Sequence, residues 1–281
     1  MENELKKSIV IIGPTASGKT KLSLTIAKTF NLNIVNADTR QFWKNIVNLS
    51  CSPTKPQKEK AKHFLFNELE SDETPDLGFW VNKIKNIKNK LITGGNCFYV
   101  KNLSIGIPSV DISQKTIETV NNIRDKYKRL KEINPSSFIH YNDIYRITSF
   151  LNFYYETGKF FETYENSYKE QLFVIKILPE KEEIENNIKI RTNEEINNFI
   201  NEIQNTEHHP NYESIIGYKE IRHYLNKKVS KEALIDEINL RTFQYAKYQC
   251  KFLKKLPYNI LINNIDHVDY EDLEKNIRLF L

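Results

Sequence analysis

Residues 8–20 decide the fold class, and they read Ser8-Ile9-Val10-Ile11-Ile12-Gly13-Pro14-Thr15-Ala16-Ser17-Gly18-Lys19-Thr20. The run up to Ile12 is rich in β-branched residues and predicts a buried strand. Apolar residues at helical spacing over 19–30 predict a helix. The segment between them fits G-x-x-x-x-G-K-S/T, a pattern that binds phosphate groups when it joins a strand to a helix. The sequence meets that condition, so it predicts a phosphate-binding loop at 13–20.

The residue types of this loop explain how it would hold an anion. Gly13 and Gly18 allow backbone conformations that turn successive N–H groups toward one cluster of oxygens, and the helix N-terminus adds partial positive charge. Lys19 adds an ammonium group, and the Thr20 hydroxyl can ligate Mg²⁺. We therefore expect a di- or triphosphate, with Mg²⁺ as cofactor and Thr20 as its ligand. The expected diphosphate-binding residues are Gly13, Thr15, Ala16, Ser17, Gly18, Lys19 and Thr20.

Strand and helix signals continue to alternate after the loop. Strands are predicted at 33–37, 91–93 and 173–178 and a helix at 79–88, which implies parallel strands joined by helices. Further helices are predicted at 115–132, 142–155, 160–170, 182–204, 218–225 and 231–256. We expect an α/β fold with a parallel-sheet core over 1–108 and 170–281, which includes the C-terminal helices. A helical insertion domain over 109–169 interrupts this core.

Composition excludes several other classes of protein. The chain has 281 residues and is 40% hydrophobic, too apolar for a disordered chain. Near its start the longest apolar run, Ile9–Ile12, is far too short for a membrane span. Cys51, Cys97 and Cys250 share no metal-ligand spacing, which favours a reducing compartment. We expect a soluble cytoplasmic protein with no membrane partner, and a net charge of +5 permits an anionic one.

Six segments together resemble the tRNA dimethylallyltransferases, also called tRNA isopentenyltransferases. The first is the loop itself, whose Gly-Pro-Thr-Ala-Ser-Gly-Lys-Thr is more specific than a general phosphate loop. The others are 36–43 (the family's ADSRQVY), 94–99 (GGTGLY), 139–146 with Gly158-Lys159 (IHPNDxxR and SGK), 216–220 (xGYKE) and 242–249 (TRQYAKRQ). The resemblance covers roughly Ile9 to Phe252, most of the chain.

This resemblance implies a P-loop NTPase-like fold with a helical insertion, and a specific reaction. The family transfers a dimethylallyl group from dimethylallyl diphosphate to N6 of adenosine 37 in tRNA, giving N6-(dimethylallyl)adenosine. The implied partners are dimethylallyl diphosphate and the tRNA anticodon stem-loop, which the insertion contacts, and we expect a monomer. The diphosphate is the leaving group, so ATP is not the expected substrate.

The resemblance also assigns roles to individual residues. Lys19, Asp38 and Asn96 are the expected catalytic residues, with Asp38 accepting a proton from the adenine amine. Local sequence offers a second interpretation of Asp38, as the N-cap of a helix that begins at Thr39. The expected tRNA-binding residues are Asp38, Thr39, Arg40, Gln41, Lys115, Arg146, Gly217, Tyr218, Lys219, Gln244 and Lys247. We expect Gly217 to allow close approach of a nucleotide.

Several positions depart from the family pattern. Asn96 stands where Thr or Ser is usual, and restoring Thr is expected to raise turnover. Phe243 and Tyr248 stand where Arg is usual, and an aromatic ring cannot replace a guanidinium fork. Ser52 replaces a Lys. These changes keep a weakly active tRNA-binding remnant open as an alternative, beside an adenylate isopentenyltransferase acting on free nucleotide and a small-molecule kinase.

Charge and aromatic patterns add two predictions. The stretch 227–255 carries eight Lys/Arg and three acidic residues, an excess of five, so it is a candidate RNA-phosphate surface or a solvated helix face. The aromatic cluster of the insertion is expected to form its core. Its members are Phe150, Phe153, Tyr154, Phe160, Phe161 and Tyr164.

Overall fold

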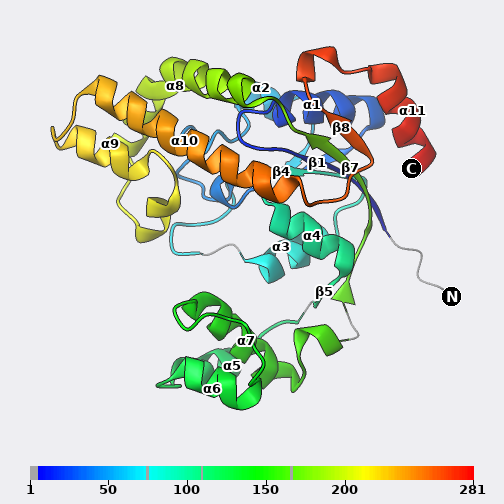
Figure 1. Ribbon diagram of the computed structural model, residues 1–281, viewed down its shortest axis with the longest axis vertical. Helices are drawn as coiled ribbons and strands as arrows, with labels where there is room; N and C mark the ends of the chain where they lie inside the picture. Colours follow the sequence, from blue (N-terminus) through cyan, green and yellow to red (C-terminus); the bar gives the residue numbers. More distant parts are fainter. Residues whose placement is uncertain (1–5, 74–75, 109, 165–166) are drawn as a thin grey trace. The chain divides into compact units, whose positions relative to one another are not determined.

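The computed structural model describes residues 6–73, 76–108, 110–164 and 167–281. The chain divides into two compact units, drawn in Figure 1. The larger unit comprises Met1–Ile105 and Lys169–Leu281, and the smaller unit comprises Gly106–Tyr168. Among the described helices, none is both long and apolar enough to cross a membrane.

A six-stranded parallel sheet forms the centre of the larger unit, with strand order β3-β2-β4-β1-β7-β8. The strands span Lys7–Ile12 (β1), Asn33–Asn36 (β2), His63–Phe64 (β3), Lys90–Gly94 (β4), Gln171–Ile177 (β7) and Ile260–Ile262 (β8). β1 lies between β4 and β7, and every residue of β1 after Lys7 is buried. A strand buried on both faces is typical of a parallel sheet that helices cover on both sides.

Helices cover the two faces of this sheet (Figure 1). On one face, α1 (Lys19–Phe30) and α11 (Tyr270–Phe280) bury Leu22, Ile26 and Ile277 against Ile9 and Ile11 of β1. On the other face lie α3 (Leu77–Ile84) and α4 (Cys97–Ile105), where the rings of Trp80 and Tyr99 pack with centroids 4.9 Å apart.

Three more helices complete the larger unit. α8 (Lys181–Gln204) and α10 (Lys231–Leu253) run side by side, and α9 (Tyr218–Leu225) packs on both. Ile184 and Ile188 of α8 form a buried cluster with Ala246 of α10, and Ala16 of the phosphate loop packs against it. Both long helices therefore reach the loop from the C-terminal half of the chain.

The smaller unit is built from short helices. It contains α5 (Gln114–Asn121), α6 (Lys126–Ile133), α7 (Ile144–Thr157), the 3₁₀ turn η2 (Phe161–Thr163) and the antiparallel pair β5 (Ile107–Pro108) and β6 (Ser167–Tyr168). Val120, Leu130 and Ile147 form its core together with Phe150, and Tyr154 and Phe160 pack against that core. These three aromatic residues are core residues, as predicted.

Two predictions about the smaller unit are wrong. The helix expected over 115–132 is two helices, because the chain turns after Asn121 and Asp125 starts α6 by accepting a hydrogen bond from Lys128 N (2.9 Å). The helix expected over 160–170 is replaced by η2 and β6; Glu165 and Asn166 lie outside the described residues. Its apolar spacing reflects rings packed against α7, such as Phe161 on Phe153 (centroids 4.2 Å apart).

Among the described residues of the larger unit, five α-helices and β-strands were not predicted. They are α2 (Lys55–Lys58), β3, α4, β8 and α11. β3, β8 and α2 are two to four residues long, too short to show a hydrophobic period. The remaining predicted strands and helices of this unit are present with ends that differ by a few residues.

Candidate functional site

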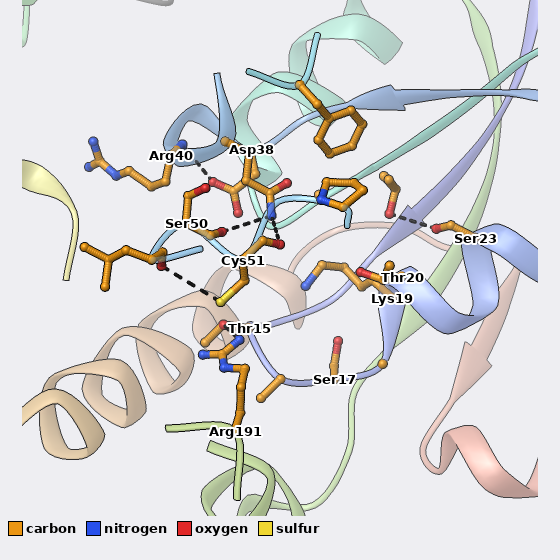
Figure 2. Close-up of a pocket in the computed structure, with 18 of the residues that line it drawn as sticks. Thr15, Ser17, Lys19, Thr20, Ser23, Asp38, Arg40, Ser50, Cys51 and Arg191 are labelled. Atoms are coloured by element: carbon orange, nitrogen blue, oxygen red, sulfur yellow. Dashed lines mark hydrogen bonds between the residues drawn. The ribbon is translucent and has the colours of Figure 1, made fainter. Parts of the chain in front are cut away.

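A cavity of about 310 Å³ lies at the carboxyl ends of β1, β2 and β4 (Figure 2). Its wall combines the phosphate loop from Thr15 to Thr20 with residues that follow β2 and with side chains of α8 and α10. Ligands bind at this edge of a parallel sheet because the connecting loops diverge there. The structure therefore places the predicted loop in a real cavity of the larger unit.

The loop geometry suits an oxyanion. Gly18 has φ +84°, a conformation that L side chains rarely adopt, and it precedes the first turn of α1. A Cβ on Gly13 would lie 2.6 Å from Ser17 Oγ and 2.8 Å from the Ile177 carbonyl, so only glycine fits. Ser17 Oγ is buried and has no hydrogen-bond partner among the described residues. A phosphate oxygen bound in the loop would be a suitable acceptor for this hydroxyl.

Lys19 points into the cavity (Figure 2), where its ammonium donates to the Pro14 carbonyl (2.6 Å). Burial lowers the pKa of Lys19 to about 8, although the Asp38 carboxylate opposes the shift and the Arg191 guanidinium adds to it. Removing a cation from water favours its neutral form unless an anion is near. The free site is thus short of negative charge, which a bound diphosphate would provide.

Arg191 is a site residue that sequence analysis missed. It comes from α8, lines the cavity, and its Nη1 donates to Thr15 Oγ1 at 3.4 Å. Its guanidinium therefore lies at the loop, on the side opposite Asp38 in Figure 2. No local pattern marks this arginine within its polar helix. Its partner Thr15 lies 176 residues away in the sequence, and the two meet because α8 packs beside the loop.

Asp38 follows β2, and its surroundings fit both interpretations drawn from the sequence, the catalytic residue and the N-cap. Its Oδ1 accepts a hydrogen bond from Arg40 N (3.0 Å) and caps the 3₁₀ turn η1 (Thr39–Gln41). Its Oδ2 accepts no hydrogen bond from any residue in the described part of the chain, and Asp38 lines the cavity. Asn36 fixes the backbone, since its side chain binds both Asp38 N (2.7 Å) and Asp38 O (3.0 Å). One oxygen is thus structural and the other is available to a ligand.

Asn96 lies beside the cavity and is not among the residues that line it. Its Oδ1 accepts hydrogen bonds from Phe98 N (3.1 Å) and Tyr99 N (3.4 Å), so it caps the start of α4. Its backbone N–H donates to the Ala37 carbonyl (3.1 Å), next to Asp38. The side-chain oxygen of Asn96 is therefore occupied by the helix, as a Thr or Ser hydroxyl could also be.

The residues after Asp38 hold the cavity wall. Arg40 Nη1 donates to Ser214 Oγ (2.5 Å), and Gln41 Nε2 donates to the carbonyls of Ser50 (3.1 Å) and Cys51 (2.9 Å). Arg40 and Gln41 both line the cavity, whereas Thr39 does not. Gln41 is committed to protein contacts, so its role here is to support the 49–53 segment of the wall.

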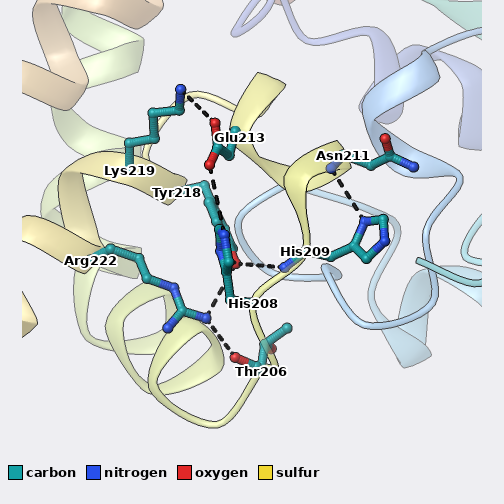
Figure 3. Close-up of polar contacts among 8 residues, drawn as sticks. All are labelled: Thr206, His208, His209, Asn211, Glu213, Tyr218, Lys219 and Arg222. Carbon is teal, nitrogen blue, oxygen red and sulfur yellow. Dashed lines mark hydrogen bonds and ion pairs between the residues drawn. The ribbon is translucent and has the colours of Figure 1, made fainter. Parts of the chain in front are cut away.

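In the xGYKE segment Gly217 and Tyr218 are buried, and Figure 3 shows the contacts of Tyr218. Tyr218 is only 1% exposed, and its hydroxyl meets His208 Nδ1 (3.0 Å), His209 N (3.4 Å) and Arg222 Nη2 (3.2 Å). Its side chain is a buried support and is not accessible to RNA. A Cβ on Gly217 would meet Leu49 Cδ1 at 2.7 Å, and the φ of this residue is +97°. The backbone conformation and the packing at the start of α9 are sufficient to require glycine at this position.

The other expected tRNA contacts are surface residues. Lys219 is paired with Glu213 (2.8 Å), and Gln244 and Lys247 are exposed on α10. Lys115 is exposed on α5 of the smaller unit, and Arg146 of the same unit pairs with Asp143 at 3.2 Å. The structure thus gathers Lys19, Asp38, Arg40 and Gln41 at one cavity and leaves these five residues on solvent-facing surfaces.

A parallel sheet with a phosphate loop between β1 and α1 defines a P-loop NTPase-like α/β protein. The family model for IPP transferase matches residues 41–256. A tRNA dimethylallyltransferase of Aliarcobacter butzleri is 33% identical over 288 residues, covering 95% of this chain and 98% of the relative. One of Thermoanaerobacter sp. is 29% identical over 309 residues, covering 97% and 96%.

Solved structures agree on the fold. A eukaryotic dimethylallyltransferase acting on tRNA has a TM-score of 0.76 at 24% identity, covering 97% of this chain and 78% of that one. A tRNA isopentenylpyrophosphate transferase from Staphylococcus epidermidis has a TM-score of 0.66 at 24% identity, covering 98% of each chain. The chain belongs to the IPP transferase family.

Proposed function

We propose that this protein transfers a dimethylallyl group from dimethylallyl diphosphate to N6 of adenosine 37 in tRNA. The observation that carries the proposal is that one cavity contains both the phosphate loop and the uncapped Oδ2 side of Asp38. The relatives that match nearly the whole chain are named tRNA dimethylallyltransferase. The product is N6-(dimethylallyl)adenosine.

The loop side of the cavity suits the departing diphosphate. As the bond between the allylic carbon and the bridging oxygen breaks, negative charge grows on the diphosphate. The loop amides, the Ser17 hydroxyl, Lys19 and Arg191 would stabilise that charge, because donors fixed in advance need no reorganisation. A Mg²⁺ ion held by the Thr20 hydroxyl would add positive charge at the same oxygens.

The Asp38 side of the cavity suits the incoming amine. The N6 nitrogen forms a bond to the allylic carbon, and one of its protons must be lost. Asp38 Oδ2 would accept that proton, while Oδ1 remains bonded to Arg40 N and keeps the carboxylate oriented. Diphosphate and a neutral secondary amine result, so atoms and charge balance.

A base inside an anticodon loop must leave its stack to enter such a cavity. We propose that the anticodon stem-loop binds through phosphate contacts to exposed cations, among them Lys115, Arg146, Lys219 and Lys247, with Gln244 nearby on α10. Double-stranded RNA, such as the anticodon stem, is recognised largely by shape and backbone contacts. We further propose that the protein acts as a monomer.

The departures from the family pattern do not remove all positive charge. Phe243 stands where arginine is usual, but Lys181 and Lys247 lie 5.7 and 5.0 Å from its ring centroid. Two ammonium groups therefore flank the position of the missing guanidinium. This arrangement supports an active enzyme over a tRNA-binding remnant.

One experiment tests the proposal against its alternatives. The pure protein is incubated with labelled dimethylallyl diphosphate, Mg²⁺ and one of three acceptors, namely unmodified tRNA, AMP or ATP. Label in tRNA supports the proposal, and a tRNA that lacks adenosine 37 is the matched control. Label in AMP would identify an adenylate isopentenyltransferase. ATP consumption without label transfer would identify a kinase. The absence of any reaction would identify a tRNA-binding remnant.

A further inference from the structure

Gln249 joins two loops of the site that are far apart in the sequence. It lies near the C-terminal end of α10 and is 4% exposed. Its Oε1 accepts a hydrogen bond from Thr15 N (2.9 Å), and its Nε2 donates to the Gly95 carbonyl (3.3 Å). The first contact spans 234 residues of sequence and the second spans 154.

The chemistry of both contacts requires an amide. A backbone N–H can meet only an acceptor and a carbonyl only a donor, so one side chain must supply both at its tip. Glutamate lacks the donor, and methionine lacks a strong hydrogen-bonding group. Gly95 is matched to this contact, because a Cβ there would clash with Gln249 Nε2.

The two contacts lead to different sides of the site. Thr15 lines the cavity and belongs to the loop that would face the diphosphate. Gly95 belongs to the turn after β4, where a Cβ would lie 3.7 Å from Asp38 Oδ2 and where Asn96 N donates to the Ala37 carbonyl. The amide of Gln249 therefore links the leaving-group side of the cavity to the carboxylate side.

We propose that Gln249 is a positioning residue that sets the distance between the bound diphosphate and Asp38. The inference rests on the proposed function. Without the amide, the part-buried Thr15 N–H and the buried Gly95 C=O lose their partners, and we expect this loss to shift both loops. The amides deeper in the loop, from Ser17 to Thr20, keep their geometry because α1 holds them.

The test is Gln249→Met, which keeps side-chain length and apolar volume. We expect its single-turnover rate of prenyl transfer to tRNA to fall about 100-fold, the loss that a misplacement of about 1 Å can cause. We expect its affinity for Mg²⁺–pyrophosphate, measured by calorimetry, to stay within about threefold of wild type, because the phosphate-facing amides are unchanged.

Two further variants keep the test decisive. Leu234→Ala removes a buried side chain from the same helix and should lower the melting temperature without lowering the rate. Gly95→Ala displaces the Gln249 amide from the other end and should reproduce the rate loss, and the double variant should be no slower than the slower single variant.

The inference is overturned if Gln249→Met transfers at the wild-type rate, or if pyrophosphate affinity falls as much as the rate. It is equally overturned if Leu234→Ala slows transfer to the same extent. Failure of wild type to label tRNA would instead contradict the proposed function. If Gln249→Met does not fold, Gly95→Ala alone decides.

Discussion

At the scale of single residues, Asp38 uses its two oxygens for two purposes. Oδ1 caps η1 through Arg40 N (3.0 Å), while Oδ2 accepts no hydrogen bond from the described residues and Asp38 lines the cavity. Asparagine caps a helix about as well as aspartate, but it cannot accept a proton from an amine at neutral pH. The two roles can therefore be separated by mutation.

We predict that Asp38→Asn keeps the fold and pyrophosphate affinity but slows transfer by about 100-fold or more, the range typical of general acid–base groups. Single-turnover assays with labelled donor measure the rate, and calorimetry measures binding. Asp76→Ala is the matched control, because Asp76 caps α3 through Phe79 N (2.7 Å) and is not among the residues that line the cavity. A fast Asp38→Asn enzyme would remove the carboxylate from the mechanism.

Lys19 gives a pH dependence. Burial lowers its pKa to about 8, so it is protonated below that pH and increasingly neutral above it. A bound diphosphate raises the pKa of the ammonium, so binding takes up a proton and affinity weakens as pH rises above about 8. We predict that pyrophosphate affinity declines by up to about tenfold per pH unit in that range.

Lys19→Arg is the control for this prediction, because guanidinium does not titrate there. The ratio of wild-type to variant affinity cancels the ionisation of pyrophosphate itself. A ratio that stays constant between about pH 7 and 10 would show that Lys19 does not titrate in this range.

At the scale of secondary-structure elements, the long helices of the C-terminal half build the site. α8 supplies Arg191 to the loop and Glu202 to the opposite wall, and α10 supplies Gln249. The Glu202 carboxylate accepts hydrogen bonds from Val47 N (2.8 Å), Asn48 N (2.8 Å) and Leu49 N (2.9 Å). It therefore holds the segment whose Leu49, Ser50 and Cys51 line the cavity.

We predict that Glu202→Gln destabilises the protein by about 1–3 kcal/mol, since an amide has one acceptor oxygen where the carboxylate has two. We expect the KM for dimethylallyl diphosphate to rise, while the phosphate loop keeps its contacts with pyrophosphate. Chemical denaturation and steady-state kinetics provide the two measurements. Glu194→Gln on the exposed side of the same helix should change neither; equal effects from both variants would contradict the prediction.

At the scale of the whole molecule, the chain consists of two compact units, and the expected RNA contacts lie on both. Arg146 of the smaller unit is 72% exposed and pairs only with its neighbour Asp143 among the described residues. A surface ion pair of this kind contributes little stability, so the guanidinium is free to exchange its partner for a phosphate.

We predict that Arg146→Ala weakens tRNA binding and reduces the slope of log affinity against log salt by about 1, with donor affinity unchanged. Filter binding at several salt concentrations measures the slope. Arg278→Ala is the matched control, because Arg278 is similarly exposed (65%) and pairs with Glu274 on α11. An unchanged slope for Arg146→Ala would exclude a phosphate contact.

Local sequence determined the phosphate loop, the strand and helix around it, and the cap at Asp38. It could do so because backbone conformation, hydrophobic period and capping depend on residues within a few positions. Resemblance to known motifs extended this to the family. Prediction from hydrophobic spacing was wrong for the aromatic run after α7, which forms η2 and β6. The spacing there reflects the packing of rings against α7 and not a helix.

Only the tertiary structure decided which distant side chains complete the site. Arg191 and Glu202 reach partners that are 176 and 153–155 residues away, and no local pattern distinguishes them from other polar helix residues. Gln249 ends the 242–249 segment, but its contact with Thr15, 234 residues away, could not be predicted from that segment. The tertiary structure also decided that Tyr218 supports the core and does not face solvent. The physical reason is that these contacts depend on how α8, α9 and α10 pack, and packing depends on the whole chain at once.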